Sequence, residues 1–253
     1  MSNPSGISHR ELVTAMKPLL ALAATIAMLG GSQELRAQAD GLVAYPETYR
    51  VQFENPWVRL VRVRVAASAM LGMHSHPAGF MFHVYLNDAE PIVFSHDGPP
   101  HEITRPAVTA RSYRIGVATP EVHSVLNFSA KHSDYQRVEY KTRGSELARQ
   151  RMQAPPLGVA SSTVVEHTGA QSRVTRVTIA AGASGEFITP AGEPALLLIV
   201  TDGVVADTSA AGQLAVTAGA ERFVAVGSKS VIRNLGTTPL QVLRFDFLTP
   251  PAQ

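Results

Sequence analysis

The stretch MHSHPAGFMFHVYLN, residues 73–87, decides how the rest of this chain is interpreted. Its first half places His74 and His76 two residues apart, and residues two apart on a β-strand face the same way. Two imidazoles that project together have the geometry of a metal clip. The second half is an apolar run that carries a third histidine, His83. The stretch therefore predicts a strand next to a histidine site.

Short, β-branched runs separated by turn residues continue from residue 50 onward. Examples are VRLVRVRVAA, FMFHVYL, PIVFS, SYRIGVA and YQRVEYK, with LND and HDGPP among the turns. This spacing predicts an all-β protein built as an antiparallel sandwich or barrel. One stretch, SELARQRM, predicts a helix, because Ser145 can cap its first turn and Pro155 and Pro156 end it. We expect residues 142–160 to be a short helical linker.

The two halves on either side of this linker resemble each other. RVRVAASA at 62–69 aligns with RVTIAAGA at 176–183, and the same offset sets YLNDAE against IVTDGV. Further on, GVATPEVHSVLN aligns with RFVAVGSKSVIRN, and YQRVEYK aligns with LQVLRFD. Segments that match in the same order indicate an internal repeat. We therefore predict two copies of one β-domain, at residues 40–141 and 161–253.

The first copy supplies a third candidate ligand, His123, in the later motif HSVLN. Three neutral imidazoles that converge suit Fe, Mn, Ni, Cu or Zn and leave positions open for water or substrate. We expect His74, His76 and His123 to form a metal site. A packed or solvent-facing trio without a metal is the alternative.

The motifs HSHP and HSVLN resemble those of the cupin superfamily, whose first motif contains HxH followed by a glutamate and whose second ends in HxxxN. The resemblance covers roughly residues 50–248 and implies a bicupin, with two tandem double-stranded β-helix (jelly-roll) barrels. It also implies that the three motif histidines hold one metal ion inside a barrel together with the glutamate. Activity does not follow from this resemblance, because one fold hosts many chemistries.

The chain departs from the cupin pattern at the carboxylate, because Met81 stands where the family has glutamate. Without this negative ligand the site is more positive by a full charge, which favours an anionic or chelating substrate. Some cupin-like dioxygenases bind Fe(II) through three histidines, and this resemblance favours Fe(II) over Zn, Mn, Ni or Cu.

The second copy lacks the histidines. The positions equivalent to His74 and His76 are Ile188 and Pro190, or Phe187 and Thr189 if the alignment slips by one residue. Ser230 replaces His123. We expect the second barrel to be degenerate and structural, covering a sheet face or edge that the first would otherwise expose.

Two further side chains of the first copy are candidates for catalysis. His83 and Tyr85 share the parity of Met81, so all three are expected to point into the barrel. His83 is interpreted as a fourth ligand, a base near the substrate or a packed core histidine, and Tyr85 as a donor to substrate or a packing residue. The other histidines of this copy lie near turns and are expected at the surface: His96, His101 and His132.

Residues 1–39 predict a signal peptide, with basic residues before the apolar run PLLALAATIAML and with Ala37 and Ala39 before a cleavage point at Asp40. The apolar run is about half of the ~20 residues that a membrane span needs, so a retained anchor is the alternative. The absence of cysteine excludes disulfides and a lipoprotein anchor. We expect a periplasmic or secreted protein with no membrane span after signal removal.

The charge balance argues against nucleic acid as a partner, since Lys plus Arg number 22 against 20 for Asp plus Glu and no dense basic run occurs. Three function classes follow: an oxygenase-like enzyme acting on a small chelating organic molecule, a non-catalytic small-molecule or metal-binding cupin, and a metal-free structural protein. Monomer and homodimer are both compatible with the pattern, because a bicupin can satisfy barrel pairing within one chain.

Overall fold

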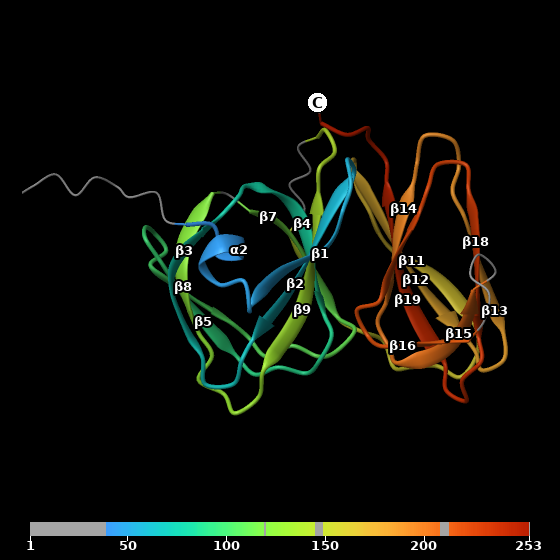
Figure 1. Cartoon of the computed structure of the whole chain (residues 1–253), viewed down its shortest axis with the longest axis horizontal. Helices are drawn as coiled ribbons and strands as arrows, with labels where there is room; N and C mark the ends of the chain where they lie inside the picture. The colour runs from blue at the N-terminus through green and yellow to red at the C-terminus, as the bar shows by residue number, and fades with distance from the viewer. Residues whose placement is uncertain (1–38, 119, 145–148, 208–212, 253) are drawn as a thin grey trace, which may run out of the picture. The chain divides into compact units, whose positions relative to one another are not determined.

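Two groups of antiparallel strands, one in each half of the chain, make up the computed structural model, in which residues 39–118, 120–144, 149–207 and 213–252 are described (Figure 1). The predicted all-β class and the two tandem barrels are confirmed. Residues 1–38, which hold nearly all of the predicted signal peptide, lie outside the described residues. Among the described residues, we find no helix with the length and apolar character that a membrane crossing requires.

The first barrel consists of two sheets, with strand orders β1-β2-β9-β4-β7-β10 and β3-β8-β5-β6. The strands are Tyr49–Glu54 (β1), Val58–Val65 (β2), Met70–His76 (β3), Gly79–Tyr85 (β4), Ile92–His96 (β5), Glu102–Arg105 (β6), Tyr113–Ala118 (β7), Glu121–Leu126 (β8), Ser133–Tyr140 (β9) and Gln150–Met152 (β10). Side chains of both sheets, such as Val63, Tyr85 and Val125, meet in one buried apolar cluster. This cluster is the interior of the barrel.

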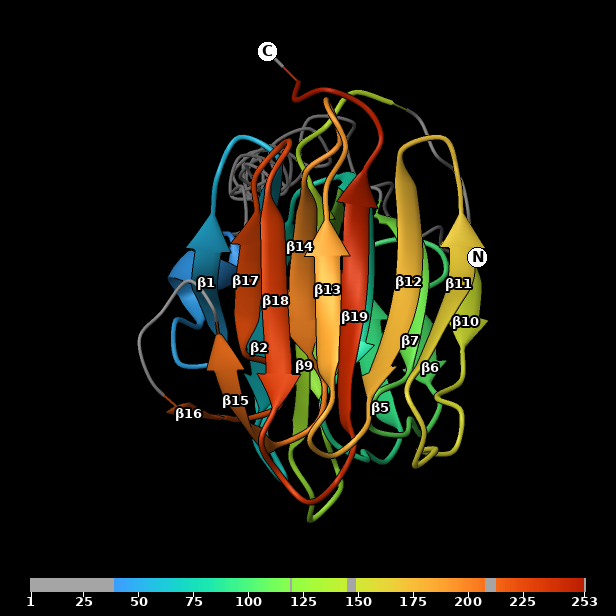
Figure 2. The ribbon, with the colours of Figure 1, turned by 90° about the vertical axis from the view of Figure 1, so that its right-hand side faces the viewer.

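The second barrel repeats the arrangement, with strand orders β11-β12-β19-β14-β17 and β13-β18-β15-β16. Its strands are Ser162–Thr168 (β11), Ser172–Ile179 (β12), Ser184–Ile188 (β13), Ala195–Ile199 (β14), Gly203–Asp207 (β15), Gln213–Val216 (β16), Glu221–Val224 (β17), Lys229–Asn234 (β18) and Leu240–Phe247 (β19). Figure 2 shows this barrel with β13 and β18 of its smaller sheet in front.

The strand register confirms the internal repeat. Val58 of β2 lies opposite Tyr140 of β9, and Ser172 of β12, 114 residues further on (172 minus 58), lies opposite Phe247 of β19. Strands β9 and β19 therefore match at an offset of 107 residues (247 minus 140). The sequence alignment of YQRVEYK with LQVLRFD differs from this register by two residues and is wrong. In the correct register, Arg137 matches Arg244 and Glu139 matches Asp246.

A second apolar cluster joins the larger sheets of the two barrels. It includes Phe82 and Val138 of the first barrel and Leu196 and Phe245 of the second, all with 0% exposure. The rings of Phe82 and Phe245 lie edge to face, 5.1 Å apart. Each such fully buried side chain contributes about 1.5–3 kcal/mol through removal from water. The second barrel thus covers a sheet face that the first would otherwise expose.

The helix predicted for SELARQRM is not formed over the second half of that segment, while residues 145–148 lie outside the described residues. Gln150–Met152 is strand β10 and pairs with β7 of the first barrel. The edge of β7 offers backbone hydrogen bonds, and Met152 packs against the apolar cluster between the barrels. These tertiary contacts override a local helix propensity of a few tenths of a kcal/mol per residue. A four-residue helix, Gly41–Ala44 (α2), precedes the first barrel.

Candidate metal centre

The three predicted ligands lie on adjacent strands of the first barrel's smaller sheet. His74 and His76 are on β3 and His123 is on β8, with His74 directly opposite His123. All three are buried, and their ligand atoms lie within 4.8 Å of one another. The described residues therefore include a group of histidines that could hold one metal ion.

Burial keeps these three rings neutral. Desolvation lowers the pKa of His74 below its ordinary value. It lowers the pKa of His76 to about 2, with the nearby Arg137 adding to the effect, and that of His123 to about 3, with repulsion from His74 adding to it. Neutral imidazole is the form that binds a metal. The donor set therefore fits a divalent transition metal.

The tautomer of His74 places its proton on Nδ1, so the lone pair of Nε2 is available to a metal ion. Its Nδ1 lies 2.8 Å from the carbonyl oxygen of Gly72, which can only accept, so Nδ1 carries the proton. The hydroxyl of Tyr49, on β1, donates to Nε2 at 2.9 Å. The backbone bond fixes the ring as outer partners of metal-bound histidines do. Sequence reasoning missed Tyr49, which precedes the first motif by 25 residues.

The guanidinium of Arg137 forms a hydrogen bond with His76. Its Nη1 donates to Nδ1 of His76 at 3.0 Å, so this lone pair also receives a hydrogen from the protein. Both nitrogens of His123, in contrast, are buried and have no hydrogen-bond partner among the described residues. An ion bound to Nε2 of His74 would take the place of the Tyr49 donor, and an ion would also satisfy a nitrogen of His123.

A second group of possible ligands consists of His96, Glu121 and His123. His96 was expected at the surface, but its side chain is only 15% exposed and lies opposite His123 in the pairing of β5 with β8. The expectation is wrong for His96 because the ring lies at the end of a strand, on the face that carries Phe94. Strand alternation carried the signal for Glu121, which stands two residues before His123.

His76 lines a cleft of about 490 Å³, and His76 and His123 together line an adjoining hollow of about 110 Å³. Five arginines line them, of which Arg149 and Arg151 are exposed and the other three are Arg105, Arg114 and Arg137. Arg105 donates to Ser133 Oγ and to the Glu90 carbonyl, each at 3.0 Å. Among the described residues, no carboxylate pairs with Arg105 or Arg114. The interior of the cleft is therefore positively charged before any metal is added.

The two residues predicted to take part in catalysis occupy different depths. His83 lines the cleft, and its Nε2 accepts a hydrogen bond from Nη2 of Arg114 at 3.1 Å. Burial, followed by the charge of Arg114, lowers the pKa of His83 well below its ordinary value. Tyr85 packs in the barrel interior, with the Arg105 guanidinium 5.4 Å from its ring centre. Neither belongs to the groups of possible ligands among the described residues, and their catalytic roles stay predictions.

Met81 stands where the cupin pattern has a glutamate, and a carboxylate lies beside it on the neighbouring strand. Glu139 of β9 lies directly opposite Met81 of β4. Its carboxylate is held between Nε of Arg59 at 2.6 Å and Nη2 of Arg137 at 2.9 Å. Glu139 thus anchors the arginine that binds His76. Asn127, on the motif HSVLN, has a bracing role, since its side-chain amide donates to the carbonyls of Ala66 and Lys131.

In the second barrel the histidine positions are filled by other residues. Phe187 lies opposite Ser230 in the pairing of β13 with β18, as His74 lies opposite His123. This register sets Phe187 and Thr189 at the places of the two motif histidines. The first alignment expected from the sequence, through Ile188 and Pro190, is therefore wrong by one residue, and the slipped alignment is correct.

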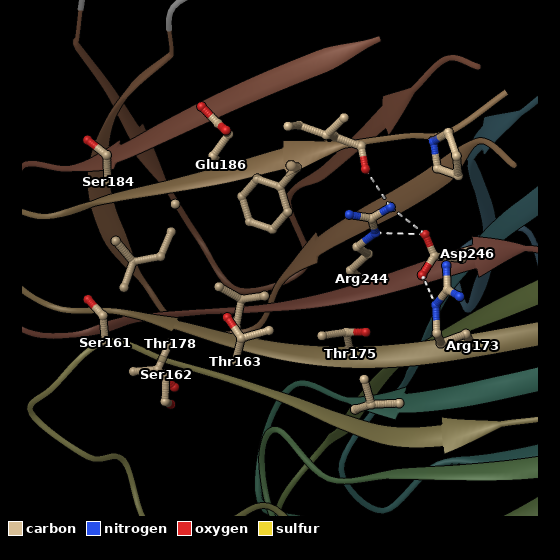
Figure 3. A pocket seen from close by; sticks show the side chains of 17 residues that line it. Ser161, Ser162, Thr163, Arg173, Thr175, Thr178, Ser184, Glu186, Arg244 and Asp246 are labelled. Carbon is tan, nitrogen blue, oxygen red and sulfur yellow. Dashed lines mark hydrogen bonds and ion pairs between the residues drawn. The ribbon is translucent and has the colours of Figure 1, made fainter. Parts of the chain in front are cut away.

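A cavity of about 710 Å³ in the second barrel has no histidine among its lining residues (Figure 3). Each barrel nevertheless holds a carboxylate between two arginines, Arg59–Glu139–Arg137 in the first and Arg173–Asp246–Arg244 in the second. Arg244 donates to the carbonyl of Ile188, whereas its counterpart Arg137 donates to a histidine. The repeat therefore kept the ion-pair framework, and only the first barrel combines it with metal ligands among the described residues.

No protein-family model and no curated protein matches the sequence. Several solved structures resemble it. They include the bacterial pirin YhhW from Escherichia coli in complex with nickel(II), with 16% identity, a TM-score of 0.55, and coverage of 81% of this chain and 91% of that one.

An oxalate decarboxylase from Lactobacillus farciminis, in a formate complex, matches with 12% identity, a TM-score of 0.52, and coverage of 81% of each chain. A salicylate 1,2-dioxygenase from Pseudoaminobacter salicylatoxidans matches with 9% identity, a TM-score of 0.50, and coverage of 76% of this chain and 72% of that one. At these identities the likeness concerns the fold. The three proteins are cupins, and this chain has the two-barrel cupin fold with a second barrel that lacks the motif histidines.

Proposed function

We propose that this chain is an exported, metal-dependent enzyme of the oxygenase type that acts on a small, chelating organic anion. One observation supports the proposal most: two of the three buried imidazoles, His76 and His123, line a hollow together with Arg105 and Arg114, which have no carboxylate partner among the described residues. Two proteins of similar fold are named for organic acids, salicylate and oxalate. Chemistry on a chelating acid would use both features of this hollow.

We assign Fe(II) to His74, His76 and His123. Three neutral ligands leave the full charge of the ion for an anionic chelator, and the arginines add to this attraction. Bound Fe(II) would supply open coordination positions and the redox chemistry toward oxygen. In a dioxygenation both oxygen atoms enter the product, so no further reductant is required.

The chain's own residues would position the anion. Arg114 faces the cleft and is held by His83, so we assign His83 the role of orienting this guanidinium toward the substrate. Arg105 lies deeper, over the ring of Tyr85, which we assign the same role. When substrate binds, Arg137 would exchange its hydrogen bond to His76 for one to the substrate and keep its ion pair with Glu139.

Oxygen consumption tests this function. Protein expressed with its N-terminal segment is loaded with Fe(II) and supplied with salicylate, oxalate, β-diketones and flavonols. We expect substrate-dependent oxygen uptake that His74→Ala abolishes and that the exposed-site control His101→Ala retains. A fully iron-loaded wild type that consumes no oxygen with any of these substrates would contradict the proposal.

Export is tested separately. We expect the mature protein in the periplasm or medium, with an N-terminus at Asp40 by Edman or mass-spectrometric sequencing. Retention of residues 1–39 in a cytoplasmic fraction would contradict it.

A non-catalytic binding cupin is the second candidate. The hydrogen bonds from Tyr49 and Arg137 to the motif histidines favour it, because they satisfy two of the three ligands without a metal. Purified protein that carries zinc and an unaltered organic anion would favour binding. Protein with a redox-active metal and oxygen uptake would favour catalysis.

A further inference from the structure

The outer part of the cleft holds a second set of donor atoms, separate from the first set except for His123. The set combines two imidazoles with one carboxylate: His96, Glu121 and His123. Its members come from neighbouring strands, since His96 on β5 lies opposite His123 on β8 and Glu121 stands two residues before His123. The sheet therefore fixes the spacing of all three side chains.

The distances between these donors match those around a metal ion. Glu121 Oε1 lies 3.5 Å from Nδ1 of His123, and Glu121 Oε2 lies 3.5 Å from Nε2 of His96. Zinc-type ions bind such nitrogen and oxygen atoms at about 2.0–2.1 Å, and two ligands of a tetrahedral ion are then separated by about 3.3–3.4 Å. Both contacts are long for a hydrogen bond and close to this separation.

His123 links the two sets. Its side chain is buried, and within the part of the chain that the structure describes neither ring nitrogen has a hydrogen-bond partner. A buried polar atom without a partner costs about 1–3 kcal/mol, so two on one ring call for an explanation. The two nitrogens lie on different edges of the ring, so the lone pair of neutral His123 serves either donor set according to the tautomer, and serving both at once requires loss of the remaining N–H proton to give an imidazolate.

Access and charge distinguish this set from the first. The side chain of Glu121 is 34% exposed and lines the cleft, so an ion can reach it from solvent. Glu121 also brings the negative charge that the cupin pattern places at residue 81, where this chain has Met81. A carboxylate favours a hard or borderline cation among the surrounding arginines.

We infer that His96, Glu121 and His123 form a second metal-binding position, for a divalent cation of the zinc or cobalt class, adjoining the histidine triad and sharing His123 with it. The inference shares with the proposed function the assumption that His123 binds metal, but it does not require turnover.

Removal of the first position isolates the second. In the His74→Ala/His76→Ala double variant of the full chain, titration with Co²⁺ is expected to give one bound ion with absorption bands of a low-coordinate site. Adding Glu121→Gln to this variant should weaken Co²⁺ binding by about tenfold or more, since even the loss of a group that only supports a ligand costs about 10–100-fold. Glu102→Gln, an exposed carboxylate on the neighbouring strand β6, is the matched control and should leave binding unchanged.

Two results would overturn the inference: a folded double variant that binds no Co²⁺, or binding that Glu121→Gln does not weaken. If the double variant fails to fold, the Co²⁺ spectra of wild type, Glu121→Gln and His96→Ala decide. The inference requires that both substitutions change the spectrum, and superimposable spectra would refute it. Failure of the proposed function has a different signature, namely iron-loaded wild type without oxygen uptake.

Discussion

At the scale of single residues, the hydroxyl of Tyr49 occupies the lone pair of His74 that a metal ion would need. An ion must break this hydrogen bond, which is worth about 1 kcal/mol net. We predict that Tyr49→Phe raises the affinity for Co²⁺ or Zn²⁺ by about fivefold, the factor that corresponds to this energy. Competition titration against a chromogenic chelator measures the change. A lower affinity in Tyr49→Phe would mean that the tyrosine itself helps to hold the ion.

The depressed pKa values of the buried histidines predict that the metal-free protein loses stability in mild acid. The pKa of His76 is about 2 and that of His123 about 3, whereas both take a proton near 6.5 when unfolded. The unfolded state therefore binds more protons between these values, and the free energy of unfolding falls as the pH falls below 6.5.

From pH 7 to 5.5 the expected loss is about 1 kcal/mol for each of these two histidines. Urea unfolding with EDTA at the two pH values measures it. His123→Asn should show a smaller fall than wild type, and the exposed control His101→Asn the same fall as wild type. Equal stability of wild type at both pH values would contradict the assignment.

At the scale of secondary structure elements, β9 of the first barrel and β19 of the second each carry an arginine and a carboxylate two residues apart. The carboxylates are buried, Glu139 at 7% and Asp246 at 1% exposure. Removing one partner of such a buried pair costs about 3–5 kcal/mol. We expect this loss for Asp246→Asn and the lower end of it for Glu139→Gln, because Glu139 is the less completely buried of the two carboxylates. Chemical denaturation measures both.

Metal affinity separates the two variants. Glu139→Gln should weaken metal binding, because Arg137 then leaves an unbalanced positive charge beside His76. Asp246 lies in the barrel without motif histidines, so the Asp246→Asn variant should bind metal with the affinity of wild type. Equal effects of the two substitutions on affinity would show that stability alone, and not the position of Arg137, controls binding.

At the scale of the whole molecule, the apolar cluster between the larger sheets makes each barrel depend on the other. Trp57, the single tryptophan, packs against this cluster with its ring 6.2 Å from that of Phe247. We predict one cooperative unfolding transition, with tryptophan fluorescence and far-ultraviolet circular dichroism changing together. Phe245→Ala should lower the free energy of unfolding by about 3–5 kcal/mol while the two signals remain coincident. Two separated transitions in wild type would contradict this coupling.

Patterns within short segments were sufficient for the fold class. The alternation of β-branched residues, the turn signals and the repeat at an offset of 114 residues predicted two similar β-barrels, and the strand pairing agrees. The strand alternation that pairs His74 with His76 needs no tertiary information, because it is a property of the extended backbone. The helix predicted at SELARQRM is wrong for Gln150–Met152, because strand pairing with β7 outweighs weak local propensity there.

The sequence by itself predicted the histidine triad, and it determined the duplication and the loss of the motif histidines from the second copy. Only the tertiary structure decided which side chains meet them: Tyr49 on His74, Arg137 on His76, and His96 with Glu121 beside His123. These contacts join strands that are distant in the chain, so their geometry depends on sheet register and barrel closure. A one-residue slip in register turns a side chain to the opposite face, and no local pattern fixes that choice across strands.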